Sequence, residues 1–136
     1  MIVKCYACEQ KNRVPANRMQ DKPKCGGCKT VMDKFAYPVK VGADEFDAAI
    51  QAADNVVVDF WSPTCGPCLM VAPELEKFSA GHEDVLVLTV NAAENATLFQ
   101  RLNIQAVPTF HRYQDGKLER TEQGFMNASQ IAEKLL

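Results

Sequence analysis

Six cysteines are the residues best suited to chemistry in this 136-residue chain, and all of them occur in Cys-x-x-Cys pairs. The three pairs are Cys5/Cys8, Cys25/Cys28 and Cys65/Cys68. The N-terminus lacks the basic and then apolar layout of a secretory signal, so we expect a cytoplasmic protein in a reducing environment. In that setting such pairs bind a metal or carry out redox chemistry more often than they form structural bridges.

The third pair is placed where a redox dithiol would have to lie. Residues 56–61 are β-branched and largely apolar, which predicts a buried central strand, and Cys65 follows where the next helix should begin. A helix N-terminus favours a thiolate over a thiol, so the pKa of Cys65 should be lowered. Cys68 faces the same side of the helix and can attack the mixed disulfide that Cys65 forms with a substrate. Gly66 leaves room for a substrate backbone, and Pro67 presets a helical φ.

The two N-terminal pairs have the spacing of a metal site. Sixteen residues separate Cys8 from Cys25, which matches a structural zinc ion held by the four thiolates of Cys5, Cys8, Cys25 and Cys28. Metal ligation would supply most of the folding energy of a segment with so few aliphatic residues. The alternative is that these pairs form redox-active disulfides in place of a metal site.

The elements that position these cysteines follow from a change of composition near residue 35, which predicts a small domain over 1–34 and a larger one over 35–136. Asp44 and Asn127 are expected helix caps, and Asp115-Gly116 is an expected hairpin turn. The order of elements predicts an α/β fold, a mixed central sheet with helices on both faces. Strands are expected over 38–41, 56–61, 85–90, 107–113 and 117–122, and helices over 44–53, 68–80, 93–102 and 127–136.

Charge is distributed unevenly along the chain. Residues 1–40 carry nine Lys/Arg and three acids, a net charge near +6, and the remainder is near −8. The two parts could attract each other, the basic part could meet an acidic partner, or the charges could simply keep a small domain soluble. No apolar run approaches the roughly 20 residues that span a bilayer, so no membrane partner is expected. Only Tyr6 precedes Phe35 among the aromatic residues, which argues against a nucleic-acid partner.

Residues from about 36 to 136 resemble a thioredoxin. The resemblance rests on the string Val58-Asp59-Phe60-Trp61-Ser62-Pro63-Thr64-Cys65-Gly66-Pro67-Cys68 and on further matches that follow it in the family's order. These matches are Pro73, Val107-Pro108-Thr109, Gly116 and Gly124. The N-terminal segment resembles the zinc ribbon of the thioredoxin-2 class. The resemblance implies a thioredoxin fold preceded by a small zinc ribbon. It also implies a monomeric protein-disulfide reductase that acts on oxidised proteins and is recycled by a flavin-dependent, NADPH-linked thioredoxin reductase.

The resemblance also implies a role for each residue of the site. Cys65 would be the attacking cysteine, Cys68 the resolving one, and Pro108 a cis-proline facing them. Asp59 would be the buried carboxylate that shuttles the Cys68 proton, and its place in an apolar strand predicts a raised pKa. Trp61 would pack beside the site. The substrate groove would be lined by Gly66, Pro67, Val107, Pro108, Gly124 and Phe125.

Three positions depart from the family pattern. Thr64 replaces an aromatic residue before the first cysteine, Leu69 replaces a lysine after the second, and Thr89 replaces a lysine that commonly pairs with the buried carboxylate. We therefore expect altered substrate choice and an Asp59 pKa above the family's usual value. Two other functions stay open: a binding or chaperone-like module whose ribbon recruits a partner, and an oxidase or isomerase. Pro67 favours a reductant over the second of these.

Overall fold

A five-stranded mixed sheet forms the centre of the protein in the computed structural model, which describes residues 1–136. The strand order is β3-β5-β4-β6-β7. Strands β3, β5 and β4 run parallel, whereas β6 and β7 run antiparallel to their neighbours. The predicted mixed sheet is therefore confirmed. The strands are β3 (Val39–Lys40), β4 (Asn55–Trp61), β5 (Leu86–Asn91), β6 (Thr109–Gln114) and β7 (Lys117–Gln123).

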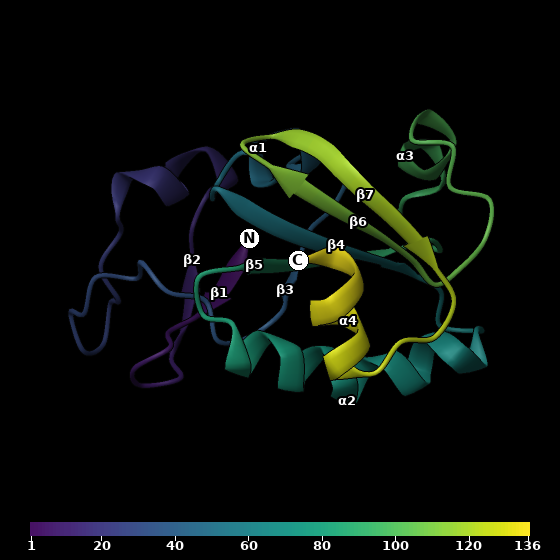
Figure 1. The fold of residues 1–136 in the computed structure, drawn as a ribbon. Helices are drawn as coiled ribbons and strands as arrows, with labels where there is room; N and C mark the ends of the chain where they lie inside the picture. The colour runs from purple at the N-terminus through teal and green to yellow at the C-terminus, as the bar shows by residue number, and fades with distance from the viewer.

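Helices cover both faces of this sheet, as expected (Figure 1). Helices α1 (Phe46–Ala49) and α3 (Ala96–Arg101) lie on one face, and α2 (Gly66–Gly81) and α4 (Ala128–Leu135) on the other. Side chains alternate along β4, so Val57 packs with the α2 and α4 core whereas its neighbours pack with the α1 core. Asp59, two residues after Val57, therefore faces α2, the helix that Cys65 precedes.

The helix expected over 44–53 is wrong in extent, because α1 spans only Phe46–Ala49. Asp44 makes no capping hydrogen bond, and the backbone N–H of Ala43 instead donates to the Asn95 side chain at 2.9 Å. At the other end Gln51 N–H donates to the Ala48 carbonyl three residues back, so the chain tightens from α-helix into a 3₁₀-like turn.

Two other local predictions are confirmed. Asp115 and Gly116 have φ of 52° and 80°, the left-handed values that a two-residue hairpin turn needs, so Asp-Gly marks the β6–β7 turn. Asn127 caps α4: its side chain accepts the Gln130 N–H at 2.9 Å, and the Gln130 side chain accepts the Asn127 N–H at 2.9 Å.

The N-terminal segment packs against the large sheet and shares its core. Strands β1 (Ile2–Lys4) and β2 (Lys11–Arg13) form an antiparallel pair, and a 3₁₀ turn, η1, spans Ala16–Asp21. Buried apolar side chains of this segment belong to the same cluster as those of β3 and α1, among them Val3, Val14, Met19, Met32 and Phe35. The sequence leaves open whether this segment packs on the active site or swings free, and the structure shows it packed on the sheet, away from the start of α2.

Polar contacts fix that packing. One Glu45 carboxylate oxygen accepts from the Met1 amino group at 3.0 Å and the other from the Ala16 N–H at 2.9 Å. The Ala16 N–H and the Met1 amino group hold the pKa of Glu45 below its usual range. The Phe35 N–H also donates to the Glu83 carbonyl at 2.8 Å. The segment thus docks at the end of the sheet opposite the start of α2 (Figure 1). None of the helices has the length and apolar character needed to cross a membrane.

Candidate functional site

Cys65 and Cys68 are joined by a disulfide whose Cα atoms lie 5.2 Å apart. Cys65 is the N-cap of α2, and its sulfur lies 3.2 Å from the Cys68 backbone nitrogen, which donates a hydrogen bond to it. Pro67 occupies the first turn, where a missing N–H costs nothing. The positive end of a 16-residue helix therefore points at the Cys65 sulfur, and this stabilises its thiolate once the disulfide is reduced.

The two cysteines differ in access to solvent. Cys65 is half-buried, whereas Cys68 is only 2% exposed. An incoming sulfur atom can therefore approach Cys65 but not Cys68. This asymmetry agrees with the roles expected for the two residues.

The loop before β6 forms the other side of the site. The Val107–Pro108 peptide bond is cis, as the resemblance implied. The Val107 carbonyl oxygen lies 3.6 Å from the Cys65 sulfur. Gly124 joins this loop from the end of β7, because its N–H donates to the Pro108 carbonyl at 2.9 Å. The loop thus places the Val107 backbone next to the Cys65 sulfur. An extended substrate peptide that reaches this sulfur can form backbone hydrogen bonds with the loop.

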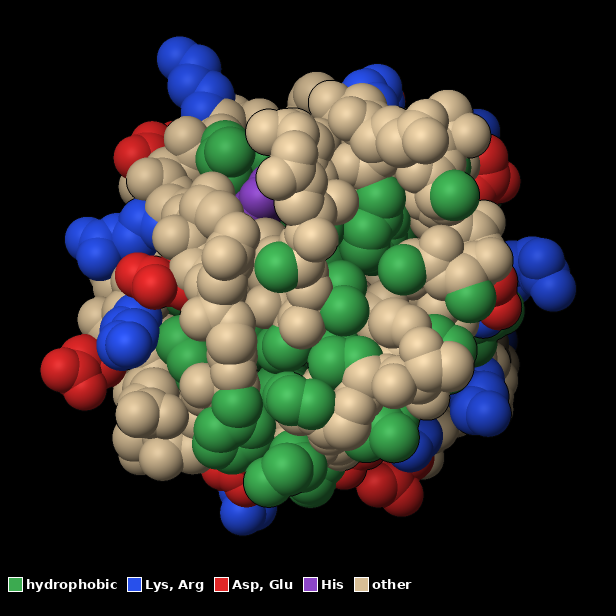
Figure 2. Space-filling model, turned by 90° about the vertical axis from the view of Figure 1, so that its right-hand side faces the viewer, with side chains coloured by type: hydrophobic (Ala, Val, Ile, Leu, Met, Phe, Trp, Pro, Cys, Tyr) green, Lys and Arg blue, Asp and Glu red, His purple; other side chains and the backbone are tan.

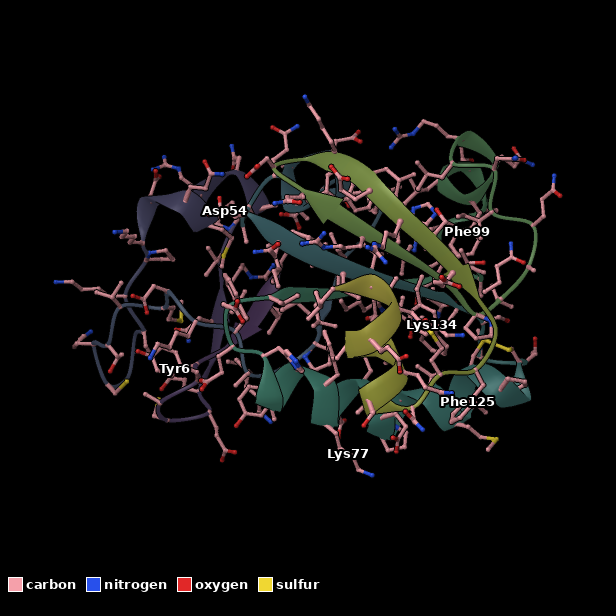
Figure 3. All side chains as sticks on the ribbon, in the orientation of Figure 1. Tyr6, Asp54, Lys77, Phe99, Phe125 and Lys134 are labelled. Carbon is pink, nitrogen blue, oxygen red and sulfur yellow. A yellow bond between two sulfur atoms is a disulfide. The ribbon has the colours of Figure 1, made fainter.

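The face of the molecule at the start of α2 has an apolar centre, with charged side chains towards its edge (Figure 2). Leu69, Met70 and Phe125 are 54%, 62% and 43% exposed. Phe125 lies near the start of α2, at the end of the molecule far from the N-terminal segment (Figure 3). A Cβ added at Gly66 would meet no atom within 4 Å, so space for a partner is open there. The sequence indicated Phe125 and Gly66, but it gave no sign that Met70 lies in the exposed patch.

Asp59 lies beneath the disulfide in an environment without a cation. Its carboxyl group is 3% exposed, and Oδ1 has no hydrogen-bond partner. Together with Cys68 and Thr89 it lines a cavity of about 240 Å³. Burial raises the pKa of Asp59 to about 7, which confirms the predicted direction. Thr89 stands directly beside Asp59 in the β4–β5 register, at the position where a lysine would oppose this shift.

The four N-terminal cysteines converge on one point. Their sulfur atoms all lie within 4.8 Å of one another, with Cys5–Cys28 at 3.8 Å and Cys8–Cys25 at 3.6 Å. A tetrahedron with Zn–S bonds of roughly 2.3 Å has sulfur–sulfur edges of roughly 3.8 Å, so the Cys5–Cys28 and Cys8–Cys25 separations match those of thiolates around one zinc ion. No disulfide joins any of the four. The donor set and spacing favour a metal site over redox-active pairs.

Backbone donors complete this centre. The N–H groups of Cys28 and Gly27 point at the Cys25 sulfur and lower the pKa of that thiol to about 6, with the Gly27 nitrogen 3.4 Å away. The Ala7 N–H approaches the Cys5 sulfur at 3.4 Å in the same way. At Cys25 these contacts favour the deprotonated sulfur that a metal requires.

The sequence family model named Thioredoxin matches residues 37–136, which include the disulfide, Asp59 and the cis-proline. The chain belongs to the thioredoxin family. A second family model, the N-terminal region of thioredoxin 2, matches residues 4–30 and so covers all four N-terminal cysteines. As a thioredoxin, the protein is a thiol-disulfide oxidoreductase that reduces protein disulfides through the Cys65/Cys68 dithiol.

Individual thioredoxins are similar over most of their length. The thioredoxin of Alicyclobacillus acidocaldarius is 36% identical over 66% of this chain and 87% of that protein. Thioredoxin C-3 of Corynebacterium nephridii is 30% identical over 80% of this chain and 75% of its own length. Among solved structures, thioredoxin f from spinach chloroplast has a TM-score of 0.69 at 30% identity, covering 74% of this chain and 92% of that one. These relatives are matched over most of their own length, which indicates that the likeness covers a whole thioredoxin domain.

Proposed function

We propose that Cys65 opens the reaction. Its thiolate attacks one sulfur of the substrate disulfide, a Cys65–substrate bond forms, and the substrate S–S bond breaks with its second sulfur leaving as a thiolate that takes a proton. The exposure of Cys65 and the helix N-terminus behind it support this role. Trp61, Gly66, Pro67, Val107 and Gly124 would hold the substrate segment, with Pro108 facing the sulfurs.

Cys68 and Asp59 complete the reaction in this proposal. The Asp59 carboxylate takes the proton of the Cys68 thiol, and the new thiolate attacks the Cys65 sulfur. The Cys65–substrate bond breaks as the Cys65–Cys68 disulfide forms, and the substrate sulfur that was bonded to Cys65 leaves as a thiolate, so two electrons have passed to the substrate. A carboxyl group with a pKa of about 7 can both accept and return a proton near neutral pH, and this supports the assignment.

We propose one further partner for the cycle: a flavin-dependent, NADPH-linked thioredoxin reductase that returns the disulfide to the dithiol in the cytoplasm. In a related solved structure, thioredoxin f2 is in complex with a ferredoxin:thioredoxin reductase, which shows that this relative binds a reductase. We take this protein to act as a monomer.

Trapping the mixed disulfide tests the proposed roles. Because Cys68 resolves the intermediate, Cys68→Ser should remain covalently bound to substrate proteins through Cys65. The measurement is non-reducing electrophoresis after incubation with an oxidised protein such as insulin, followed by release with dithiothreitol. The double variant Cys65→Ser/Cys68→Ser should trap none. If the double variant retained partners as well as the single one, docking without disulfide chemistry would be the better description.

Residues 1–34 would form a ribbon that holds one structural zinc ion between Cys5, Cys8, Cys25 and Cys28. Zinc would hold the two turns together, and no redox step is assigned to it. We expect one zinc per chain by atomic absorption. Cys25→Ser should lose the metal and lower the free energy of unfolding, because Cys25 is fully buried within the shared core. Zinc-free protein with unchanged stability would contradict the assignment.

A further inference from the structure

A groove with a volume of about 700 Å³ separates the ribbon from helix α2. One wall is the β1–β2 pair, with Lys4 and Lys11, and the other is the outer side of α2, with Pro73, Lys77 and others. The linker, residues 36–38, forms the base. The groove exists only because the ribbon is packed beside α2, so a thioredoxin domain alone would not have it.

The groove adjoins the redox site. Pro38 and Glu76 line both this groove and the smaller cavity that contains Cys68 and Leu69. Helical spacing explains the continuity, because positions 65, 69, 73, 76 and 80 are separated by four, four, three and four residues and so share one face. That face leads from the reactive sulfur to the ribbon.

The ribbon wall carries positive charge from two lysines. Lys4 and Lys11 lie directly opposite each other in the β1–β2 register, a placement that costs free energy through like-charge repulsion. Neither lysine forms an ion pair. Lys4 Nζ is held 4.5 Å above the Tyr37 ring, at the base of the groove. The positioned Lys4 ammonium group and the exposed Lys11 side chain, neither in an ion pair, suit a ligand that brings its own carboxylates.

The other wall adds little negative charge. Glu76 is the only acid that lines the groove. Three lysines line it as well, so the lining residues have a net charge of +2. One of these, Lys77, already pairs with Glu74 at 3.0 Å. The remaining α2 lining is small and apolar, from Pro73 and Ala80. The groove is therefore basic along the ribbon and apolar along the helix.

We propose that this groove binds an extended acidic segment of the oxidised protein substrate while its disulfide is reduced at Cys65. The proposal rests on the disulfide reductase function and names a class of substrate for it. The helix from Leu69 to Ala80 has eleven rises of about 1.5 Å and so spans roughly 16 Å, which about five residues of extended chain would cover. The segment therefore alternates carboxylates, facing Lys4 and Lys11, with small apolar residues facing Pro73 and Ala80.

Synthetic peptides with one internal disulfide test the proposal. One set carries a five-residue Asp/Ala extension, on either the N- or the C-terminal side, and a matched set carries Asn in place of Asp. The readout is kcat/KM for reduction by the zinc-loaded, full-length protein. We expect one acidic peptide to be reduced about tenfold faster than its Asn counterpart in low salt, the effect of two partly exposed ion pairs. Lys4→Glu/Lys11→Glu should abolish this preference and leave the Asn peptides unaffected.

Two matched variants separate the groove from general charge. Lys4→Arg/Lys11→Arg should keep the preference. Lys22→Glu/Lys24→Glu, which changes the ribbon's charge equally outside the groove, should keep it too. All variants are compared at equal zinc content and equal stability. Equal rates for Asp and Asn peptides in the wild type, or a preference that survives Lys4→Glu/Lys11→Glu, would overturn the proposal. So would an oligonucleotide that needs these lysines for binding when the peptides show no preference. Failure to reduce the Asn peptides would instead count against the reductase function.

Discussion

Replacement of Cys65 by serine should reduce the rate of insulin-disulfide reduction by dithiothreitol to that without the protein. The reason is chemical, because a serine hydroxyl stays protonated at neutral pH, whereas a thiol at a helix N-terminus is substantially thiolate. The expected fold is unaffected, since Cys65 is half-exposed and caps the helix with an atom that oxygen can replace. The measurement is the turbidity of reduced insulin over time.

A conservative change beside the nucleophile provides the control. Thr64→Ser alters the neighbouring residue and keeps the hydroxyl that approaches Ser62 at 3.1 Å, so it should retain most of the activity. Full activity in Cys65→Ser would show that another cysteine pair carries the reaction. The N-terminal pairs Cys5/Cys8 and Cys25/Cys28 would then be the first candidates.

Replacement of Asp59 by asparagine should stabilise the oxidised protein increasingly as the pH rises. The folded-state pKa is about 7 against an ordinary 3.8, so between these values unfolding releases a proton and stability falls with increasing pH. Above pH 7 the buried carboxylate is charged and the full destabilisation is present. Asparagine does not titrate, so the stability advantage of the variant should grow by about 2–3 kcal/mol from pH 5 to pH 8, at about 1.4 kcal/mol per pKa unit.

Urea unfolding of both proteins at several pH values measures this difference. The disulfide keeps Cys65 and Cys68 from titrating, so neither contributes to the pH dependence. A constant difference between pH 5 and pH 8 would mean that Asp59 has an ordinary pKa. Thr89→Lys provides an independent check, because an ammonium group beside the carboxylate should lower the Asp59 pKa towards its ordinary value in an NMR titration. An unchanged pKa in Thr89→Lys would contradict the cause assigned here.

The mixed sheet and the order of elements along the chain could be predicted because local signals pointed to them, whereas the roles of Asp59 and Pro108 came from the resemblance to thioredoxins. The apolar run of β4 and the Asp115-Gly116 turn are each patterns of a few neighbouring residues, so they can be recognised in the sequence alone. Helix α1 shows where such reasoning fails. Asp44 is a good capping residue by type, but the helix begins only at Phe46, and the N–H of Ala43 just before Asp44 is fixed by the Asn95 side chain, far along the chain.

The docking of the ribbon could not be predicted for the same reason. Glu45 reads as a surface acid in a helix, and its partner, the Ala16 N–H, lies 29 residues earlier. The lysines of the groove likewise look like solubilising charges until the register places Lys4 opposite Lys11. The candidate metal site, by contrast, could be predicted from the sequence spacing of its cysteines, because four cysteines at this spacing have few functions other than to bind a metal ion.

The burial of Cys68 has a consequence for how the protein turns over. Since only one sulfur of the pair is open to collision, the substrate and the recycling reductase must both form their covalent bond at Cys65. They cannot occupy the protein together, so each cycle alternates between an oxidised form that accepts only electron donors and a reduced form that accepts only electron acceptors. Such a protein follows ping-pong kinetics, because each partner reacts with a different redox form of the same sulfur atom.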